Sequence, residues 1–225
     1  MERMIYLPVP LILFLIFLLL VPFIWFAVTI DVVQIAAAKL GFSPTVGLIL
    51  LSLIILGSAF NIPLYRTEST SSLVDELSDL HRQLYWRIPF HKVKSVTVVA
   101  LNVGGGLIPT LLALYQFWHA DALSILLVTG IVTLVTYFAA HVIPGIGIQM
   151  NALVAPITAS LAALSITNTH PSAVAFAGGV LGTLLGADLL HFKDMKTIGA
   201  GIVSIGGAGV FDGIALCGLF SLLLT

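Results

Sequence analysis

Two aspartates interrupt the most apolar part of this sequence. Asp212 lies in S-I-G-G-A-G-V-F-D-G, residues 204–213, and Asp188 lies in L-L-G-A-D-L-L near the end of the preceding apolar segment. Ionisable groups are costly within a membrane span and therefore indicate a functional site. Two facing carboxylates can share a proton, so that one activates water and the other protonates a leaving group. The structural alternatives are an Asp188 at a loop edge that caps local backbone or pairs with Lys193, and an Asp212 that caps a helix restarting after the glycine run.

The composition places this chain in a membrane. Of its 225 residues, 59% are hydrophobic and 8% are charged, whereas a soluble domain carries roughly 25% charged residues. So few charges cannot cover a water-facing surface, so the bilayer is the expected partner. The single cysteine, Cys217, excludes an intramolecular disulfide and a cysteine-based zinc site. No basic patch indicates nucleic acid, and no H-E-x-x-H or Walker A run indicates a metal or ATP, so no cofactor is expected.

Apolar windows of roughly 20 residues predict an all-α, polytopic membrane domain over residues 1–225. The predicted spans are about seven, at residues 5–28, 45–65, 95–117, 121–141, 143–167, 172–190 and 199–225. Between the second and third spans, residues 66–94 predict an amphipathic loop, because leucines recur there at helical spacing among charged residues.

The distribution of lysine and arginine predicts the orientation. With seven spans, one side of the membrane collects all but one of the nine basic residues, and Lys39 alone falls on the other side. Cytoplasmic loops are enriched in lysine and arginine. The N-terminus and the 66–94 loop are therefore expected in the cytoplasm and the C-terminus outside, in the cytoplasmic membrane of a prokaryote.

Polar residues within the predicted spans gather toward the cytoplasmic half, beside runs rich in glycine and proline. Such runs break a helix and are tolerated where helices pack closely or line a watery cavity. They predict a polar cavity open to the cytoplasm. Its expected lining residues are Asn61, Asn102, Gly104, Gly105, Gly106, His141, Gln149, Asn151, Gly206, Gly207 and Gly209.

A faint internal repeat accompanies this pattern. G-S-A-F-N-I-P-L, residues 57–64, precedes a polar loop and then V-V-A-L-N-V-G-G-G-L-I-P; G-T-L-L-G-A-D-L, residues 182–189, precedes a polar loop and then I-V-S-I-G-G-A-G-V-F-D. Duplication is common among membrane transport folds. The repeat therefore favours a pseudo-symmetric core.

Four motifs carry a resemblance to a known family. They are N-I-P-L at 61–64, N-V-G-G-G-L-I-P at 102–109, G-A-D-L at 186–189 and the 204–213 stretch. Over about residues 45–225 the chain resembles an uncharacterised bacterial and archaeal membrane-protein family that carries the domain-of-unknown-function label 1614. The resemblance implies a multi-span membrane protein and implies no activity.

The two aspartates also give a looser similarity to the presenilin, signal-peptide-peptidase and prepilin-peptidase group of intramembrane aspartyl proteases. That group carries one aspartate in each of two adjacent helices, the second in G-x-G-D. Here Asp212 follows G-x-G-x-x-D, no tyrosine precedes Asp188, and no clear P-A-L motif follows.

Three functions are compatible with these features. The first is an intramembrane aspartyl-type hydrolase that uses Asp188 and Asp212 on a membrane-protein or peptide substrate. The second is a transporter for a small solute or ion, with Asp212 and Asp188 as proton or cation sites at broken helices. The third is a non-catalytic scaffold that docks through the 66–94 loop. The sequence leaves the oligomeric state open.

Overall fold

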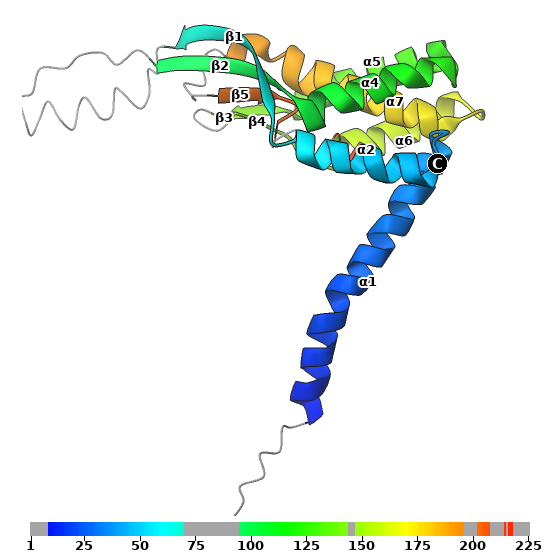
Figure 1. Ribbon diagram of the computed structural model, residues 1–225. Helices are drawn as coiled ribbons and strands as arrows, with labels where there is room; N and C mark the ends of the chain where they lie inside the picture. The colour runs from blue at the N-terminus through cyan, green and yellow to red at the C-terminus, as the bar shows by residue number, and fades with distance from the viewer. Residues whose placement is uncertain are drawn as a thin grey trace, which may run out of the picture.

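A computed structural model describes residues 9–69, 95–143, 147–195 and 202–207, together with residues 214, 216 and 217. Helices make up most of these residues, and two small sheets lie at one end of the helical bundle (Figure 1). The first helix, α1 (Val9–Lys39), leaves the bundle at an angle and contacts α2 (Pro44–Gly57) near their connection (Figure 1).

The remaining helices form the bundle. They are η1 (Val103–Leu107), α4 (Ile108–Tyr115), η2 (Gln116–Trp118), α5 (Ala122–Ala139), α6 (Val154–Ile166), α7 (Pro171–Thr183), η3 (Leu184–Leu189) and the short α8 (Phe192–Met195). Two of them, η1 and η3, are π-helical, and each is continuous with an α-helix.

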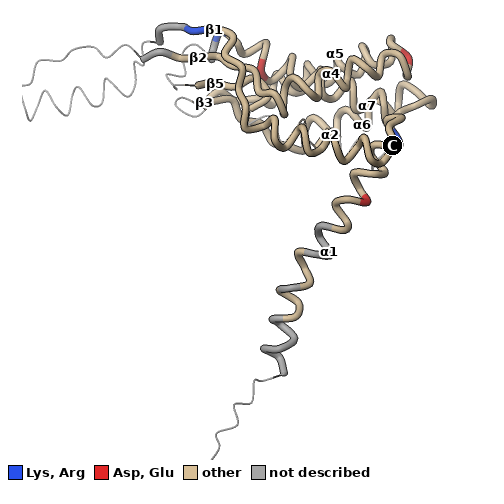
Figure 2. The backbone as a smooth tube through the Cα atoms, in the orientation of Figure 1, with Lys and Arg blue, Asp and Glu red and all other residues tan. Residues whose placement is uncertain are grey.

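Three described helical segments are long and apolar enough to cross a membrane: Ile16–Lys39, Ala122–Ala139 and Pro171–Leu189. Ala122–Ala139 and Pro171–Leu189 match two of the predicted spans, whereas Ile16–Lys39 overlaps the predicted 5–28 span and runs past its end at residue 28. The chain is therefore membrane-associated. Figure 2 shows that the bundle carries almost no charge along its length, because charged residues lie mainly toward its two ends and on α1. The arrangement with seven spans stays a prediction.

The all-α prediction holds only in part, because the described residues are mostly helical but five strands replace parts of the predicted spans. The three-stranded sheet contains β1 (Asn61–Ser69), β2 (Ser95–Asn102) and β5 (Ile202–Ile205), in the order β1-β2-β5. The other sheet is the hairpin of β3 (His141–Ile143) and β4 (Gly147–Gln149). Segments such as V-T-V-V-A-L and I-V-S-I are apolar enough to resemble a span, yet their β-branched residues favour strands.

These strands change the predicted boundaries. The 45–65 span becomes α2 followed by β1, and the 95–117 span becomes β2, η1 and α4. In the 143–167 and 199–225 segments, strands β4 and β5 occupy the first part. The predicted loop at 66–94 begins as the outer half of β1, and its residues 70–94 lie outside the described part of the chain.

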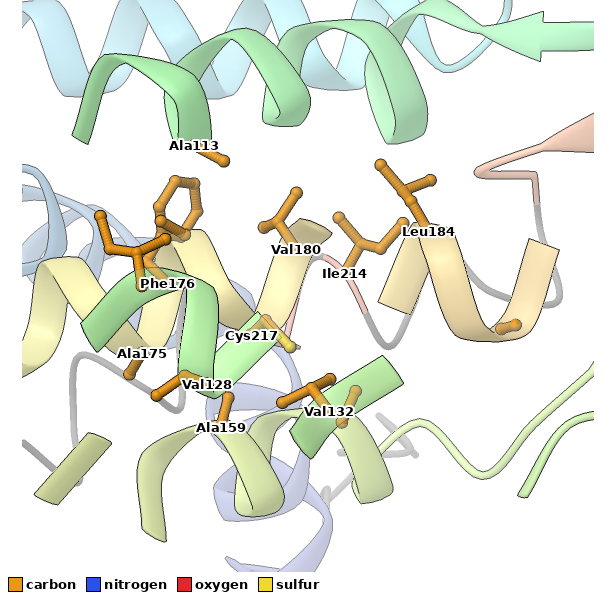
Figure 3. Packing of buried hydrophobic residues seen from close by; sticks show 14 of the residues in the cluster. Ala113, Val128, Val132, Ala159, Ala175, Phe176, Val180, Leu184, Ile214 and Cys217 are labelled. Atoms are coloured by element: carbon orange, nitrogen blue, oxygen red, sulfur yellow. The ribbon is translucent and has the colours of Figure 1, made fainter. Parts of the chain in front are cut away.

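A glycine-lined seam between α5 and α7 forms the centre of the bundle. Gly178 faces Val128 and Gly182 faces Val132; a Cβ added at Gly182 would lie 2.6 Å from the Val132 Cβ. Across the same seam, the Thr136 hydroxyl donates to the Gly182 carbonyl at 3.2 Å. Small residues let helices approach closely, which is how apolar helices associate in lipid. Figure 3 shows the surrounding core, with Val180 and Leu184 among side chains of α4, α5 and α6.

The sheet pairing brings three chain segments to one place. β1 and β2 are antiparallel with Asn61 opposite Asn102, and β2 and β5 are parallel with Leu101 opposite Ile205. The start of β1 and the ends of β2 and β5 therefore share the sheet end next to the helices. Gly104, Gly105 and Gly106 follow β2, and Gly206 and Gly207 follow β5, so these described glycines of the two runs also lie at this end of the sheet.

Candidate functional site

Asn102 is the centre of a polar network at this end of the sheet. It is the last residue of β2 and caps η1, where its Oδ1 accepts the Gly105 N–H at 2.7 Å. Its Nδ2 donates to the Ser58 carbonyl at 2.8 Å and to the Asn61 Oδ1 at 3.1 Å. An extended backbone followed by a helical turn is the usual geometry of a capping asparagine. This one buried side chain thus joins β2, η1, β1 and the end of α2.

Ser204 extends the network to the third strand. Its hydroxyl donates to the Asn61 Oδ1 at 2.6 Å. Asn61 is exposed and Ser204 is half-buried, whereas Asn102 is buried. The network therefore leads from the surface of the protein to the N-terminal end of η1.

Asp188 lies beside this network, in the π-helical segment η3. Its side chain is 1% exposed, and its Oδ2 accepts the Gly206 N–H at 2.6 Å. It is the one acidic side chain among the buried residues of the described chain. The alternative in which Asp188 pairs with Lys193 at a loop edge does not hold, because Asp188 is buried and the Lys193 side chain is exposed.

Gly206 joins the two glycine runs backbone to backbone. Its φ of +67° lies in the left-handed region that favours glycine. A Cβ at this position would lie 2.7 Å from the Gly106 nitrogen and 2.8 Å from the Gly105 carbonyl oxygen. On the other side of η1, a Cβ at Gly104 would collide with the Ile54 carbonyl and the Ser58 nitrogen. No side chain fits between these segments, so their glycines hold Asp188 close to η1.

Both π-helical segments of the described chain border this site. η1 follows Asn102 directly, and η3 contains Asp188. A π-turn widens a helix and is often found at functional sites. At the end of η3, the His191 Nδ1 lies 3.1 Å from the Gly186 carbonyl, and the His191 ring stacks on Tyr137 at 4.8 Å between centroids. The His191 side chain, just beyond the end of η3, is therefore a hydrogen-bond partner of the Gly186 carbonyl within η3.

The sequence prediction missed several of these contributors. Ser58 acts through its backbone carbonyl, which leaves no signal in the sequence. Ser204 stands inside the 204–213 motif and His191 follows Asp188 by three residues. A histidine just after a helix end is a recognised carbonyl partner, so His191 had a readable signal.

The structure places other predicted residues elsewhere. His141 and Gln149 are exposed and pair with each other in the β3–β4 hairpin. Asn151 is also exposed, and its Oδ1 accepts the Leu153 N–H at 3.0 Å. No hydrogen bond among the described residues links these three to Asn102 or Asp188. A shared cavity lining that includes them is therefore not seen in the described part of the chain.

The remaining predicted residues divide between the site and the undescribed segment. Gly207 closes the turn after β5, with its N–H donated to the Ser204 carbonyl at 3.0 Å. Asp212 and Gly209 lie outside the described residues. The structure thus brings together Asp188, Asn61, Asn102, Gly104, Gly105, Gly106, Gly206 and Gly207.

These groups are a buried carboxylate bound to the Gly206 N–H, and two carboxamides and a hydroxyl that are linked to one another at the same end of the sheet. A carboxylate can accept or donate a proton or bind a cation, and carboxamides can orient a polar group. Among the described residues, no group of three or more His, Cys, Asp or Glu side chains is placed to hold a metal ion.

Comparison with known proteins gives one match. Residues 55–224 match the sequence model of a family described as "Protein of unknown function (DUF1614)". No curated protein and no solved structure matches the chain. The match covers most of the chain and includes every residue of the polar site. The chain therefore belongs to the DUF1614 family of proteins of unknown function.

Proposed function

We propose that this protein is an intramembrane aspartyl-type hydrolase that uses Asp188 and Asp212. One observation carries the proposal: the buried Asp188 carboxylate binds the N–H of Gly206, the residue that opens the glycine run leading to Asp212. Six residues of chain limit the distance from Gly206 to Asp212 to about 20 Å at full extension. A turn within this run would bring the second carboxylate to the first.

The reaction follows from two carboxyl groups that share one proton. The ionised carboxylate accepts a proton from water as the water oxygen attacks a substrate carbonyl carbon. The protonated carboxyl donates its proton to the leaving amide nitrogen, and the carbon–nitrogen bond breaks to give a carboxylic acid and an amine. The Asn61 Nδ2, at the exposed end of the network, would orient the polar groups of the substrate beside Asp188.

The two edges of the three-stranded sheet favour a polypeptide substrate. The edge strand β1 contains Pro63 and an irregular register between Pro63 and Tyr65, features that discourage pairing with a further strand. The opposite edge strand, β5, has neither proline nor charge and runs directly into Gly206. An open strand edge binds an extended chain through main-chain hydrogen bonds. A peptide on β5 would lead toward Asp188.

The proposed orientation places the sheet at the cytoplasmic face. The long connection between β1 and β2 joins Ser69 to Ser95, at the end of the sheet away from the helices. It contains Arg82, Arg87, Lys92 and Lys94. Lys39 lies at the other end of the bundle, where α1 meets α2. By the positive-inside rule, the sheet end faces the cytoplasm.

The test compares membrane proteomes of cells that carry the wild-type chain, Asp188→Asn, Asp212→Asn or Asp121→Asn. New protein N-termini are enriched and counted by mass spectrometry. Cleavage products should disappear with either Asp188→Asn or Asp212→Asn and persist with Asp121→Asn, whose carboxylate only caps α5. Cleavage products that persist in Asp188→Asn or in Asp212→Asn would contradict the proposed hydrolase.

The transporter is supported by a different observation, the meeting of two helix irregularities, η1 and η3, at Asp188. Broken helices that surround an ionisable group are typical of ion-binding sites in transporters. Purified protein in vesicles containing a pH-sensitive dye distinguishes the two functions. Proton flux that Asp188→Asn abolishes and Asp212→Asn retains would favour a transporter. The scaffold hypothesis predicts neither proton flux nor loss of cleavage products.

A further inference from the structure

We propose that Phe60 and the first part of β1, with its side chains Ile62 and Leu64, lie in the acyl-chain layer of the bilayer. The inference does not depend on the proposed hydrolase. It places the polar site within the apolar thickness of the membrane, close to one boundary.

The exposed apolar surface does not end where α2 ends. Ile55 and Leu56, in the last turn of α2, are 58% and 66% exposed. Immediately beyond them, Phe60 is 66%, Ile62 42% and Leu64 57% exposed. A continuous apolar patch of this kind is unfavourable in water and normally marks a membrane or protein contact. Since the α2 part of the patch belongs to a membrane-associated bundle, its continuation on β1 fits the same acyl chains.

The lengths of the elements support this depth. Helix α2 has 14 residues, which span about 21 Å, less than the roughly 30 Å of a hydrocarbon core. Helix α2 alone therefore does not reach the thickness of the apolar layer, so exposed apolar residues beyond it are needed to match that layer.

The backbone of β1 is adapted to this environment. Unpaired N–H groups at a sheet edge are costly in lipid. Pro63 has no N–H, and a proline in an edge strand turns its missing donor outward. Tyr65, Arg66 and Glu68 follow in the same strand, and aromatic and charged residues are typical of the membrane boundary. The boundary therefore lies between Leu64 and Arg66.

The pairing of β1 extends this conclusion to the site. Asn61 lies opposite Asn102 and hydrogen-bonds to it, so both are at the depth of the apolar part of β1. Both N–H groups and the Oδ1 of Asn102, and the Oδ1 of Asn61, therefore have protein partners where lipid offers none. Their hydrogen bonds to Ser58 and Ser204 serve the same purpose.

Spin labels on single cysteines test the proposed depth. Cys217 is fully buried, so the wild-type chain serves as the blank for labelling. Ile62→Cys and Leu64→Cys are the test positions, Leu56→Cys is the lipid control, and Arg66→Cys marks the boundary. All four side chains are exposed, so the fold should tolerate the label, and Phe60→Cys replaces any variant that aggregates. The labelled protein is studied in phosphatidylcholine–phosphatidylglycerol vesicles.

The measurement compares collision of each label with oxygen, which concentrates in lipid, and with a neutral nickel chelate, which stays in water. Labels at Ile62 and Leu64 should match Leu56, with high oxygen and low nickel accessibility, and nickel accessibility should rise at Arg66. Nickel accessibility at Ile62 and Leu64 equal to that at Arg66 would place β1 in water. Low accessibility to both reagents would mean that a second protein surface covers β1. Either result would overturn the inference.

Discussion

Glycine serves two different purposes in the two most closely packed regions of this molecule. In the seam between α5 and α7, the space of a missing Cβ at Gly178 or Gly182 is filled largely by valine side chains of the facing helix. At the sheet end, the space at Gly206 and Gly104 is filled by the backbone of another glycine run or of α2. The first region has mainly apolar neighbours, and the second has Asn102 and Asp188 beside it.

This difference separates a region where glycine only allows close helix packing from a region where glycine positions the groups of a polar site. The facing valine Cβ atoms belong to one helix, which can shift slightly against α7, so the seam has some tolerance. At the sheet end the backbone is held on both sides and cannot shift, so the polar groups there keep their positions. We therefore infer that the seam holds the bundle together and that the sheet end holds Asp188 in place.

The largest effect should come from Gly206→Ala. The new Cβ combines a left-handed backbone with a clash against the backbone of Gly105 and Gly106. We expect a loss of about 4 kcal/mol in the free energy of unfolding. Denaturant unfolding in detergent micelles measures this loss. The matched control is Gly130→Ala on α5, where no atom lies within 4 Å of the added Cβ; it should be neutral or slightly stabilising. If Gly206→Ala and Gly130→Ala changed the free energy of unfolding equally, the close backbone contact at Gly206 would not explain the rigidity of the sheet end.

Asn102→Ala should have the next largest effect. It removes the cap of η1 and leaves the Ser58 carbonyl without this donor. The expected loss is about 3 kcal/mol. Ser52→Ala, which removes one exposed hydroxyl from α2, is the control and should change stability little. A loss at Asn102 no larger than at Ser52 would show that the network does not hold the sheet end.

Gly182→Ala should cost less than either. The nearest atom to the new methyl is the Val132 Cβ, which moves only if α5 shifts slightly against α7, and alanine favours a helix more than glycine does. We expect a loss of about 1–2 kcal/mol. In a double-mutant cycle, Val132→Gly, which removes this Cβ, should recover part of the loss if the clash is the cause. Absence of any recovery would mean that the seam is as rigid as the sheet end.

The smallest effect should be a pH dependence at the opposite end of the bundle. The Ser124 hydroxyl and N–H donate to Asp121 and hold the pKa of its carboxyl below the ordinary value. A lowered pKa in the folded state stabilises α5 above about pH 4, and this contribution is lost as pH falls through the lowered pKa. Unfolding measured from pH 6 to pH 3 should show it. Asp121→Asn keeps a cap at every pH and should flatten this part of the profile; an unchanged profile would exclude the effect.

The sequence predicted the parts of the fold that depend on local apolar pattern. The long apolar segments at 121–141 and 172–190 contain α5 and α7–η3. The strands were missed because β2 and β5 are apolar runs within windows that also suit a helix. Their parallel pairing joins residues about a hundred positions apart, which no local pattern indicates.

The site was predictable in its residue types and less so in its geometry. Asn102, Asp188 and Gly206 were marked by their place in apolar, glycine-rich segments. The contact between Asp188 and Gly206 depends on the π-turn of η3 and on the left-handed backbone of Gly206. His141 and Gln149 lie in a hairpin and not in the helix along which their depth was counted, so their place in a shared cavity stays a prediction.

The most direct test of the central claim is a disulfide between positions 188 and 212. Asp188→Cys and Asp212→Cys are combined in a Cys217→Ala background and oxidised with copper phenanthroline in membranes. Asp121→Cys with Asp212→Cys is the control pair, because position 121 begins α5 at the other end of the bundle. A disulfide requires Cα atoms within about 7 Å. The account predicts rapid bond formation for 188–212 and none for 121–212. A folded 188–212 variant that forms no disulfide would contradict the paired carboxylates.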